Sequence, residues 1–379
     1  MLSYQKFMGA GFPIFQRHYG ASLEPLSRTQ SARKRALRFL TLVCSPKYGF
    51  SAEAHSDQDG SKSVFGIPTS YDSALLLPIL TDEGICPEVA DSLAHVLRSS
   101  RRDNGNWNFF IREPDAEADL FPDDVDDTSC PLMALYLTDQ INVQELAAQC
   151  GQMIRHAIKS EDGVLTTWLR MGPERRIVHD KYLRVPKICV GCLVNCLWLF
   201  AHANMETWQE LRPSVEYIAD HLPILRQQQV GDTTVPGMSY YINRFVVYFF
   251  LSRLLQRSEY CRDLLGRDFE KVIVAELVEF DGDDARGADA LNIAGLILAA
   301  ITLKLHVAGS PVTEALVRNR CVALVKTLLR LQDEDGSFPK GVIYKWNNCG
   351  YYGGSRAYSS AMALHAIGRV EREILIEPL

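Results

Sequence analysis

The sequence lacks the features that mark membrane-spanning, nucleic-acid-binding and secreted proteins. Its 379 residues contain no run of about 18 uncharged apolar residues, the minimum for a transmembrane helix. The formal net charge is −6, whereas nucleic-acid binders usually present a basic face. Lys6, Arg17 and His18 interrupt the first 20 residues, so no signal-type apolar core is present there. We expect no membrane span and no nucleic-acid partner, with weak membrane association of the amphipathic start as an open alternative.

The ten cysteines also lack a pattern that binds metal or forms a disulfide framework. Cys189, Cys192 and Cys196 are closely spaced, but no second ligand pair at matching spacing accompanies them. Cys192, Cys196 and Cys321 lie in apolar helical runs, and the other cysteines are scattered. Buried free thiols of this kind are typical of a reducing compartment, so we predict a cytoplasmic protein without a structural metal.

Apolar residues make up 47% and charged residues 23% of the chain, as in a globular enzyme. The apolar residues fall into helical runs of two alternating kinds. The first kind has one charged face and comprises residues 30–44, 87–102, 143–160, 206–229, 259–280 and 312–332. The second kind is apolar nearly all round and comprises residues 71–80, 127–137, 190–203, 241–255, 289–303 and 357–367.

A helix with one charged face lies on a surface, whereas a helix that is apolar all round is enclosed. The pair repeats about every 57 residues, enough for two helices and two loops. We predict an all-α fold, an (α/α)6 barrel of six inner and six outer helices. It forms a single domain over residues 1–379, with residues 1–28 as an N-terminal arm. Glycine-containing turns are expected at 104–107, 161–163, 281–283 and 335–338, and no segment with strand periodicity competes.

The most distinctive segment is the acidic run at residues 123–127, where the second inner helix is expected to begin. Asp127, Thr128 or Ser129 is suited to cap that helix, which is the ordinary role of such residues. However, the apolar sequence beyond the run would carry the last carboxylates toward the enclosed side of the barrel. Packed carboxyl groups in an apolar setting resist ionisation, and a neutral carboxylic acid can serve as a general acid.

The segment Asp124-Val125-Asp126-Asp127-Thr128 resembles the DxDD motif of class II terpene cyclases, which include squalene–hopene cyclases and copalyl diphosphate-type synthases. Residues 71–74 (YDSA) are similar to the family's YDTA-type inner-helix start. Residues 332–338 (QDEDGSF) resemble its QxxxGxW turns, with Phe338 in place of Trp, and residues 104–107 are a second, partial copy. Familiar relatives have two or three helical domains, so this chain is most similar to single-domain cyanobacterial meroterpenoid cyclases of the merosterolic acid synthase type.

The resemblance implies a proton-initiated cyclisation. In the family the middle aspartate protonates an alkene, which corresponds to Asp126, and Asp124 and Asp127 would orient it. Burial keeps the proton on the acid, and the helix N-terminus stabilises the carboxylate that forms. Successive double bonds of a prefolded prenyl chain then attack the cation, so the shape of the site supplies much of the rate.

Aromatic side chains near the inner-helix starts can stabilise carbocations, although core packing is the commoner role of each one. The candidates are Tyr71, Trp107, Trp168, Tyr240, Tyr241, Tyr351, Tyr352 and Tyr358. Asp289 is a further polar candidate, with helix capping as its equal alternative. Arg356 and Arg244 are candidates to hold an anionic headgroup. A basic loop over residues 170–187 could do so too, or simply form a solvated surface.

For the substrate we expect a farnesylated dihydroxybenzoic acid, held by Arg356 at the end opposite Asp126. No cofactor is then required. The alternative within the class is a prenyl diphosphate of the drimenyl or copalyl type, which would need Mg²⁺. A glycosidase on the same barrel would need a more polar cleft than these inner helices offer. A binding toroid would not explain the aspartates, and a prenyltransferase subunit would require a zinc site that the sequence does not provide.

Overall fold

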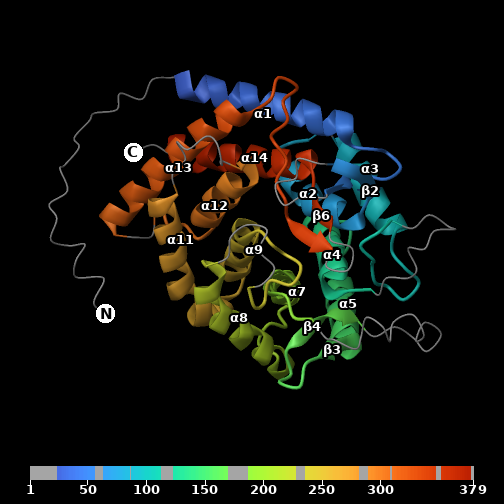
Figure 1. Cartoon of the computed structure of the whole chain (residues 1–379). Coiled ribbons are helices and arrows are strands. Elements are labelled where there is room, and N and C mark those ends of the chain that lie inside the picture. The colour runs from blue at the N-terminus through green and yellow to red at the C-terminus, as the bar shows by residue number, and fades with distance from the viewer. Residues whose placement is uncertain are drawn as a thin grey trace.

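The computed structural model describes residues 24–55, 63–85, 87–111, 123–169, 187–227, 235–280, 289–307, 310–346 and 351–376. Within these ranges the chain forms two concentric layers of helices, as Figure 1 shows from one end. The predicted alternation of outer and inner helices is confirmed. The amino-acid composition of each helix decides its layer: a helix with one charged face lies in the outer layer, and the next helix, which is apolar all round, lies in the inner layer.

The inner layer consists of six helices: α2 (Ser70–Asp82), α4 (Val125–Leu137), α7 (Val190–His202), α9 (Arg244–Arg257), α12 (Ala290–Thr302) and α14 (Arg356–Val370). Each packs against the next, and α14 packs against α2, so the ring is closed. Nearly every residue of α7 and α12 is buried. Gly295 is required where α12 meets α9, because a Cβ there would lie 2.5 Å from the Phe245 carbonyl oxygen.

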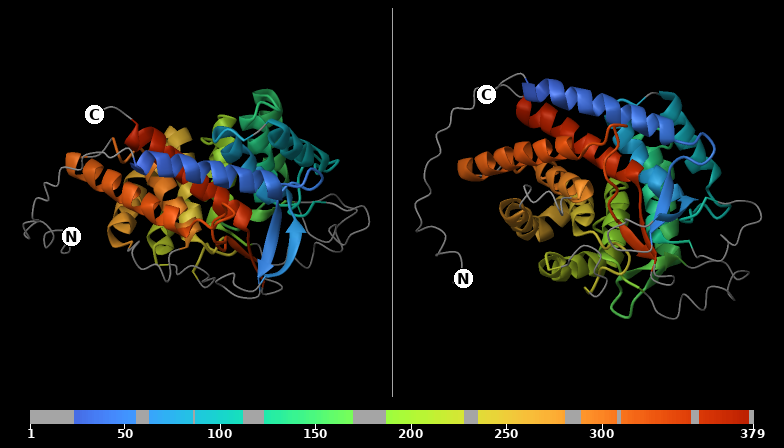
Figure 2. Two further views of the ribbon diagram at one scale, coloured as in Figure 1. Left: turned by 90° about the horizontal axis from the view of Figure 1, so that it is seen from above. Right: turned by 45° about the horizontal axis from the view of Figure 1, so that its top comes forward.

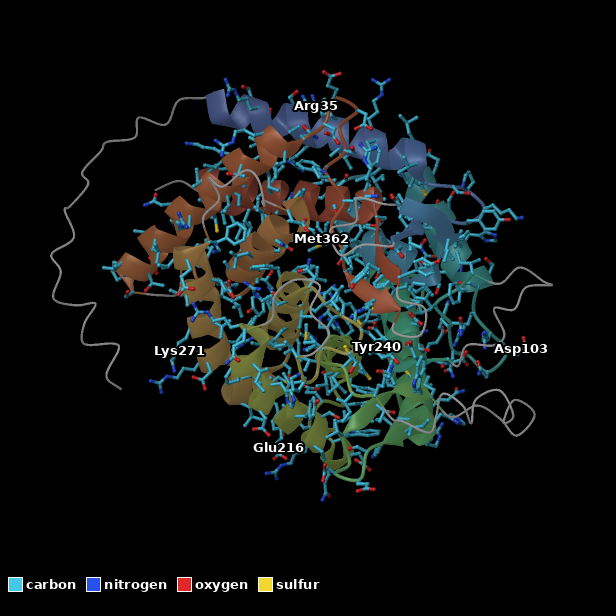
Figure 3. The ribbon with its side chains drawn as sticks, in the orientation of Figure 1. Arg35, Asp103, Glu216, Tyr240, Lys271 and Met362 are labelled. Atoms are coloured by element: carbon cyan, nitrogen blue, oxygen red, sulfur yellow. The ribbon has the colours of Figure 1, made fainter. Side chains whose placement is uncertain are left out.

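The outer layer consists of α1 (Glu24–Val43), α3 (Pro87–Ser99), α5 (Val143–His156), α8 (Arg212–Leu225), α11 (Arg267–Glu279) and α13 (Pro311–Leu331). Short segments η3 (Gln209–Leu211), α10 (Glu259–Cys261) and η4 (Arg262–Gly266) precede α8 and α11, and η5 (Glu371–Leu375) comes after α14. The labelled Arg35, Glu216 and Lys271 in Figure 3 lie at the outer rim, as the charged faces of α1, α8 and α11 require. Because α1 already begins at Glu24, the expectation of an arm reaching residue 28 is wrong for residues 24–28.

The expected turns after the outer helices share one hydrogen-bond pattern. In three of them the amide of a glycine, Gly105, Gly163 or Gly336, donates to the carbonyl three residues earlier. All three glycines have φ between 82° and 92°, a conformation that glycine adopts without strain. Gly336 also lies against α1, where a Cβ would be 2.4 Å from the Arg35 carbonyl oxygen. The fourth expected turn, at 281–283, lies outside the described residues.

Short strands accompany the helices, although no strand periodicity marks them in the sequence. β1 (Ser51–His55), β2 (Ser63–Pro68), β5 (Tyr344–Trp346) and β6 (Tyr351–Gly354) build an antiparallel sheet in the order β2-β1-β6-β5. A second hairpin pairs β3 (Ala157–Lys159) with β4 (Leu165–Leu169), so α5 ends four residues before the predicted 160. These strands are short and belong to loops at the N-terminal ends of inner helices, with β1 and β2 visible below α1 in the left view of Figure 2.

No helix within the described ranges is long and apolar enough to cross a membrane. The longest, α13, has 21 residues but carries several arginines and a lysine along its exposed side.

Candidate active site

The acidic run lies at the N-terminus of α4, inside the ring. Asp124 is extended, with φ −128° and ψ 166°, and its Oδ1 accepts a hydrogen bond of 2.6 Å from the Asp127 amide. Asp124 is therefore the helix cap, and the expectation that residue 127, 128 or 129 caps the helix is wrong. Because α4 begins at Val125, Asp126 and Asp127 both lie in its first turn, where the helix dipole favours negative charge.

The structure separates Asp123 from the other three aspartates. Asp123 forms an ion pair with Arg102, with Nη1 and Oδ1 2.8 Å apart. Its other oxygen accepts hydrogen bonds from the side-chain amides of Asn104 (2.7 Å) and Asn106 (3.5 Å). Asp123 thus holds the turn after α3 against the start of α4.

Asp126 accepts a hydrogen bond on each of its two oxygens. Its Oδ2 accepts a hydrogen bond of 2.5 Å from the Tyr241 hydroxyl, and its Oδ1 accepts one of 2.9 Å from Asn195 Nδ2. Cys130 Sγ lies 3.6 Å from the same Oδ1. Burial raises the pKa of Asp126 to about 6, although the bonds from Tyr241 and Asn195 act in the opposite direction. The group is therefore a carboxylic acid that holds its proton to an unusually high pH while its conjugate base has two donors ready.

Asp124 and Asp127 form a carboxyl pair that responds to the charge of Asp126. Burial and the nearby Asp126 charge raise the pKa of Asp124 to about 7. The pKa of Asp127 is raised well above its ordinary value by burial and by the neighbouring carboxylates. A hydrogen bond between the two side chains lowers the pKa of Asp124 and raises that of Asp127. This places the shared proton on Asp127, which donates it toward Asp124.

Aromatic rings surround the acid. The hydroxyl groups of Tyr71 and Tyr241 are in hydrogen-bond contact. The Tyr71 ring packs against those of Phe109 and Tyr344, with centroid distances of 6.2 and 6.0 Å. Tyr358 on α14 is buried and electrostatically coupled to Asp126. The structure thus brings the predicted Tyr71, Tyr241 and Tyr358 together around Asp126, in a setting suited to a carbocation.

The other predicted aromatic residues lie farther from the acid or face elsewhere. Trp107 is buried, but its Nε1 donates to the Leu97 carbonyl of outer helix α3 at 2.7 Å, so it packs between the layers. Trp168 on β4 is bridged through its backbone to Asp124, and its ring meets that of Tyr240 (Figure 3) at 5.9 Å. Tyr351 and Tyr352 lie on β6, where Lys345 lies over the Tyr352 ring. They pack in the sheet, and no contact joins them to Asp126 in the described residues.

Two further aspartates lie at inner-helix starts without joining the cluster directly, Asp72 buried and Asp289 half-buried. Asp289 caps α12 through the Leu291 amide at 2.8 Å, which selects the capping alternative for this residue. Asp72 lies in the first turn of α2, where its Oδ2 accepts from the Thr69 hydroxyl at 2.5 Å and from the Tyr344 hydroxyl at 3.5 Å. Burial raises the pKa of both carboxyl groups to about 6.

The predicted headgroup anchors are engaged elsewhere. Arg356 forms ion pairs of 3.1 Å with both Asp333 and Asp335, on the side of α14 that faces α1, and its guanidinium lies over the Phe39 ring. To hold a substrate carboxylate, as the sequence predicts, Arg356 would have to leave these two aspartates. Arg244 pairs with Glu276 of outer helix α11 at 3.2 Å. Residues 170–186 of the basic loop lie outside the described residues, and Lys187 lies over the Tyr240 ring at 5.5 Å.

Sequence reasoning missed the hydrogen-bond partner of the acid on α7. Asn195 is buried in an otherwise apolar helix, and its amide reaches both Asp126 and, at 3.3 Å, the Tyr241 hydroxyl. A lone polar residue on an enclosed helix was the available signal, because such a group must find a partner inside. Phe109 was also missed, since it lies in a loop whose course a sequence pattern does not reveal.

The acidic cluster does not form a metal site by itself. Among the residues that the structure describes, no three histidine, cysteine, aspartate or glutamate side chains are arranged to hold a metal ion. Cys189, Cys192 and Cys196 are buried free thiols, Cys189 as the N-cap residue of α7 and the other two on that helix.

Comparison with known proteins places these features in context. Residues 88–203, which include the acidic run and Asn195, match the model of the sesquiterpene cyclase astC-like C-terminal domain. The chain is 28% identical over 267 residues to drimenol cyclase drtB from Aspergillus calidoustus, covering 69% of this chain and 41% of that protein. The chain thus spans less than half the length of this relative.

Several solved structures with the same fold cover nearly the whole chain. The type II terpene cyclase MstE from Scytonema, in complex with geranylgeranyl dihydroxybenzoate, superposes with a TM-score of 0.60 at 13% identity, covering 93% of this chain and 99% of that one. A protein from Actinoplanes gives the same TM-score at 16% identity, covering 90% and 99%. The chain is therefore similar in sequence to sesquiterpene cyclases and has the α/α-barrel fold of a type II terpene cyclase.

Proposed function

We propose that this chain is a class II terpene cyclase, which starts cyclisation by protonating the terminal alkene of a linear prenyl chain. The observation that carries the proposal is the environment of Asp126. It is a buried carboxylic acid at a helix N-terminus, with two hydrogen-bond donors and a surrounding set of aromatic rings. The similarity to a drimenol cyclase and to the astC-like domain supports it.

Asp126 combines two properties that alkene protonation requires. Burial keeps its proton in place until the substrate is present, since the pKa of Asp126 is raised. The Tyr241 hydroxyl and the Asn195 amide donate to its oxygens, so they stabilise the carboxylate left behind. In the reaction the O–H bond of Asp126 breaks and a C–H bond forms at the terminal alkene carbon. The electron pair of the next double bond closes the first ring.

The walls of the site control the cation once the proton has been transferred. Tyr71, Phe109 and Tyr344 are mutually packed, so their faces and edges hold fixed positions next to the acid. A ring face attracts a cation by about 0.5–2 kcal/mol without reacting with it. The rings therefore favour a prefolded chain and keep water away from the intermediates.

The substrate we propose has three isoprene units, since the matching sequence family is that of sesquiterpene cyclases. For the headgroup, the sequence relative favours a diphosphate of the drimenyl type. An aromatic acid is the second candidate, because the MstE structure holds geranylgeranyl dihydroxybenzoate in the same fold. With Arg356 paired to Asp333 and Asp335, neither headgroup would be held by that residue.

Metal dependence separates the two headgroups. Proton transfer from Asp126 to carbon proceeds between the acid and the alkene, and a carboxylate headgroup can be bound by basic side chains. A diphosphate carries more charge, which Mg²⁺ usually offsets. Cyclisation of the aromatic substrate should therefore persist in EDTA, whereas cyclisation of the diphosphate should stop.

The deciding experiment offers the purified protein farnesyl diphosphate and farnesyl-dihydroxybenzoic acid, each with Mg²⁺ and with EDTA, and analyses products by mass spectrometry. Asp126→Asn is the matched variant, because its amide has the size of the carboxyl group but cannot deliver the proton. Wild-type cyclisation that is absent from Asp126→Asn is expected. Equal product formation by Asp126→Asn would overturn the assignment of the acid. Failure of the wild type on every prenyl substrate would overturn the cyclase assignment.

A further inference from the structure

An arginine lies inside the ring, behind the hydrogen-bond partner of the acid. Arg253 is in α9, in a segment that otherwise presents buried aromatic and aliphatic side chains. Its guanidinium carbon lies 4.0 Å from the centroid of the Trp198 ring, and 4.8 Å from those of Phe249 and Phe250. Its Nη2 donates to Asn195 Oδ1 at 3.2 Å, and its buried Nε has no hydrogen-bond partner.

This arrangement is expensive for a residue that only fills space. A guanidinium that is shielded from water, as that of the half-buried Arg253 is, loses part of its hydration, and the usual compensation is a carboxylate held at ion-pair distance. Within the described residues no carboxylate approaches Arg253 in that way, and its guanidinium instead contacts three rings and one amide oxygen. A methionine or leucine would pack there at lower cost. The cation therefore has a role other than stability.

The bond from Arg253 fixes which way the Asn195 amide faces. An amide has one accepting and one donating end, and the two ends can exchange by rotation. Because Oδ1 accepts from the guanidinium, the donating Nδ2 faces Asp126 Oδ1 at 2.9 Å. With the amide reversed, its oxygen would accept the proton of Asp126 and hold it on the acid. The fixed orientation instead supports the ionised form that arises once the proton has gone to the alkene.

We propose that Arg253 is a positioning residue, which acts through Asn195 to keep a hydrogen-bond donor on the proton-donating carboxyl group of Asp126. The proposal rests on the proposed cyclase function. Arg253 does not itself contact Asp126. The guanidinium–amide–carboxyl chain across α9, α7 and α4 carries the larger part of the effect, and the charge of Arg253 adds to it in the same direction.

The titratable and charged groups around Asp126 come from five helices and from the segments just before α4 and α9. They are Asp127 and Cys130 of α4, Cys192 and Cys196 of α7, Arg253 of α9, Tyr71 of α2, Tyr358 of α14, Asp124 just before α4 and Tyr241 just before α9. Arg253 is the single cation among these described groups, and its charge favours the ionised form of Asp126, as the fixed amide does.

The test compares Arg253→Met, Asn195→Leu and the double variant, with Arg253→Lys as the conservative variant and Arg244→Met as a control on the same helix. Each is measured for kcat and KM from pH 5 to 9. If Arg253 acts through Asn195, Arg253→Met lowers kcat about 10- to 100-fold with KM within about twofold. The decline of kcat at alkaline pH moves to higher pH in Arg253→Met, and Arg253→Lys restores part of the lost kcat. The double variant is then no slower than Asn195→Leu, within about threefold.

The proposal would be overturned if kcat of the double variant fell by the product of the two single-variant factors, or if the pH profile of Arg253→Met were the same as that of the wild type. A drop in kcat of the same size in Arg244→Met would also overturn it, since that residue pairs with Glu276 at the outer layer.

A second readout needs no turnover, so it separates this proposal from the cyclase assignment. The carbonyl stretch of protonated Asp126 is identified in infrared spectra by its loss in Asp126→Asn, and is titrated in wild type, Arg253→Met and Arg244→Met. The midpoint is expected to rise by about one pH unit in Arg253→Met alone, equivalent to a tenfold change in the ionisation equilibrium. An unchanged midpoint refutes the role of Arg253, whatever substrate the enzyme uses. A raised midpoint in a protein that cyclises nothing refutes only the cyclase function.

Discussion

Replacing Tyr241 by phenylalanine tests the acid more directly than any other single change. The variant removes the hydroxyl that donates to Asp126 Oδ2 at 2.5 Å and keeps the ring, which packs against Phe250 with a centroid distance of 5.6 Å. A hydrogen bond to a charged group contributes about 1.5–3 kcal/mol. At 1.36 kcal/mol per unit, its loss is expected to raise the pKa of Asp126 by about one to two units.

That rise has two effects on catalysis. The acid is weaker, so kcat on the low-pH plateau should fall about 10- to 100-fold. The protonated form also persists to higher pH. In the wild type, with a pKa of Asp126 of about 6, the protonated fraction and the rate fall as pH rises through that value. In Tyr241→Phe this decline should begin about one unit higher, so the deficit relative to wild type shrinks at pH 8.

The assay is product formation from saturating prenyl substrate between pH 5 and 9. Tyr248→Phe is the matched control, because its buried hydroxyl donates to Glu276 at 3.2 Å, away from the acid. It should lose some stability but keep the wild-type pH profile. If Tyr241→Phe loses activity by the same factor at every pH, the reasoning that links Tyr241 to the ionisation of Asp126 is refuted.

Three further changes test other parts of the structure. Gly191→Ala places a Cβ 2.3 Å from Tyr241 Cδ2, so we expect it to displace the tyrosine ring and to lower kcat at least about tenfold. The control is Gly151→Ala on outer helix α5, where the new Cβ has its nearest neighbour at 3.6 Å and turnover should not change. Wild-type turnover in Gly191→Ala would contradict the geometry. Asp72→Asn removes a buried carboxyl with a pKa of about 6, against 3.8 in the unfolded chain. The free energy of unfolding of the wild type therefore falls by up to about 3 kcal/mol as pH rises from about 4 to 6, and that of Asp72→Asn does not. The melting temperature of the variant relative to that of the wild type should therefore increase over this pH interval. Glu83→Gln breaks the buried contacts of Glu83 with Arg33, Arg372 and His365, and should lower the free energy of unfolding by about 3–5 kcal/mol in denaturant titrations while leaving kcat intact. Unchanged unfolding of Glu83→Gln would show that this cluster does not tie α1, α2 and η5 together.

The helical barrel was readable in the sequence because its signal is local. Whether a helix is apolar on one face or all round depends on residues within the helix itself, so α7 and α12 could be recognised as inner helices from their own composition. The turns at Gly105, Gly163 and Gly336 were readable for the same reason, since a positive φ favours glycine wherever it occurs. The Asp126 segment stood out because four carboxyl groups beside an apolar helix conflict with burial.

The contacts between residues far apart in the chain could not be read from the sequence. β1 pairs with β6, so its partner comes from the other end of the chain, and three-residue strands such as β5 carry no periodicity to detect. The charge of Arg356 does not reveal whether the side chain faces a substrate or Asp333. Its ion pair with Asp333 results from the position of the 332–338 turn in the folded barrel.

The acid depends most on tertiary structure. Asp124 and Asp127 are sequence neighbours of Asp126, but the donors Tyr241 and Asn195 and the cation Arg253 are brought to it by closure of the ring. Burial and hydrogen bonding set the ionisation of a carboxyl group, and both are properties of the assembled barrel. The chain pattern indicated where a proton donor lies, and the packing of α4, α7 and α9 determines how strong an acid it is.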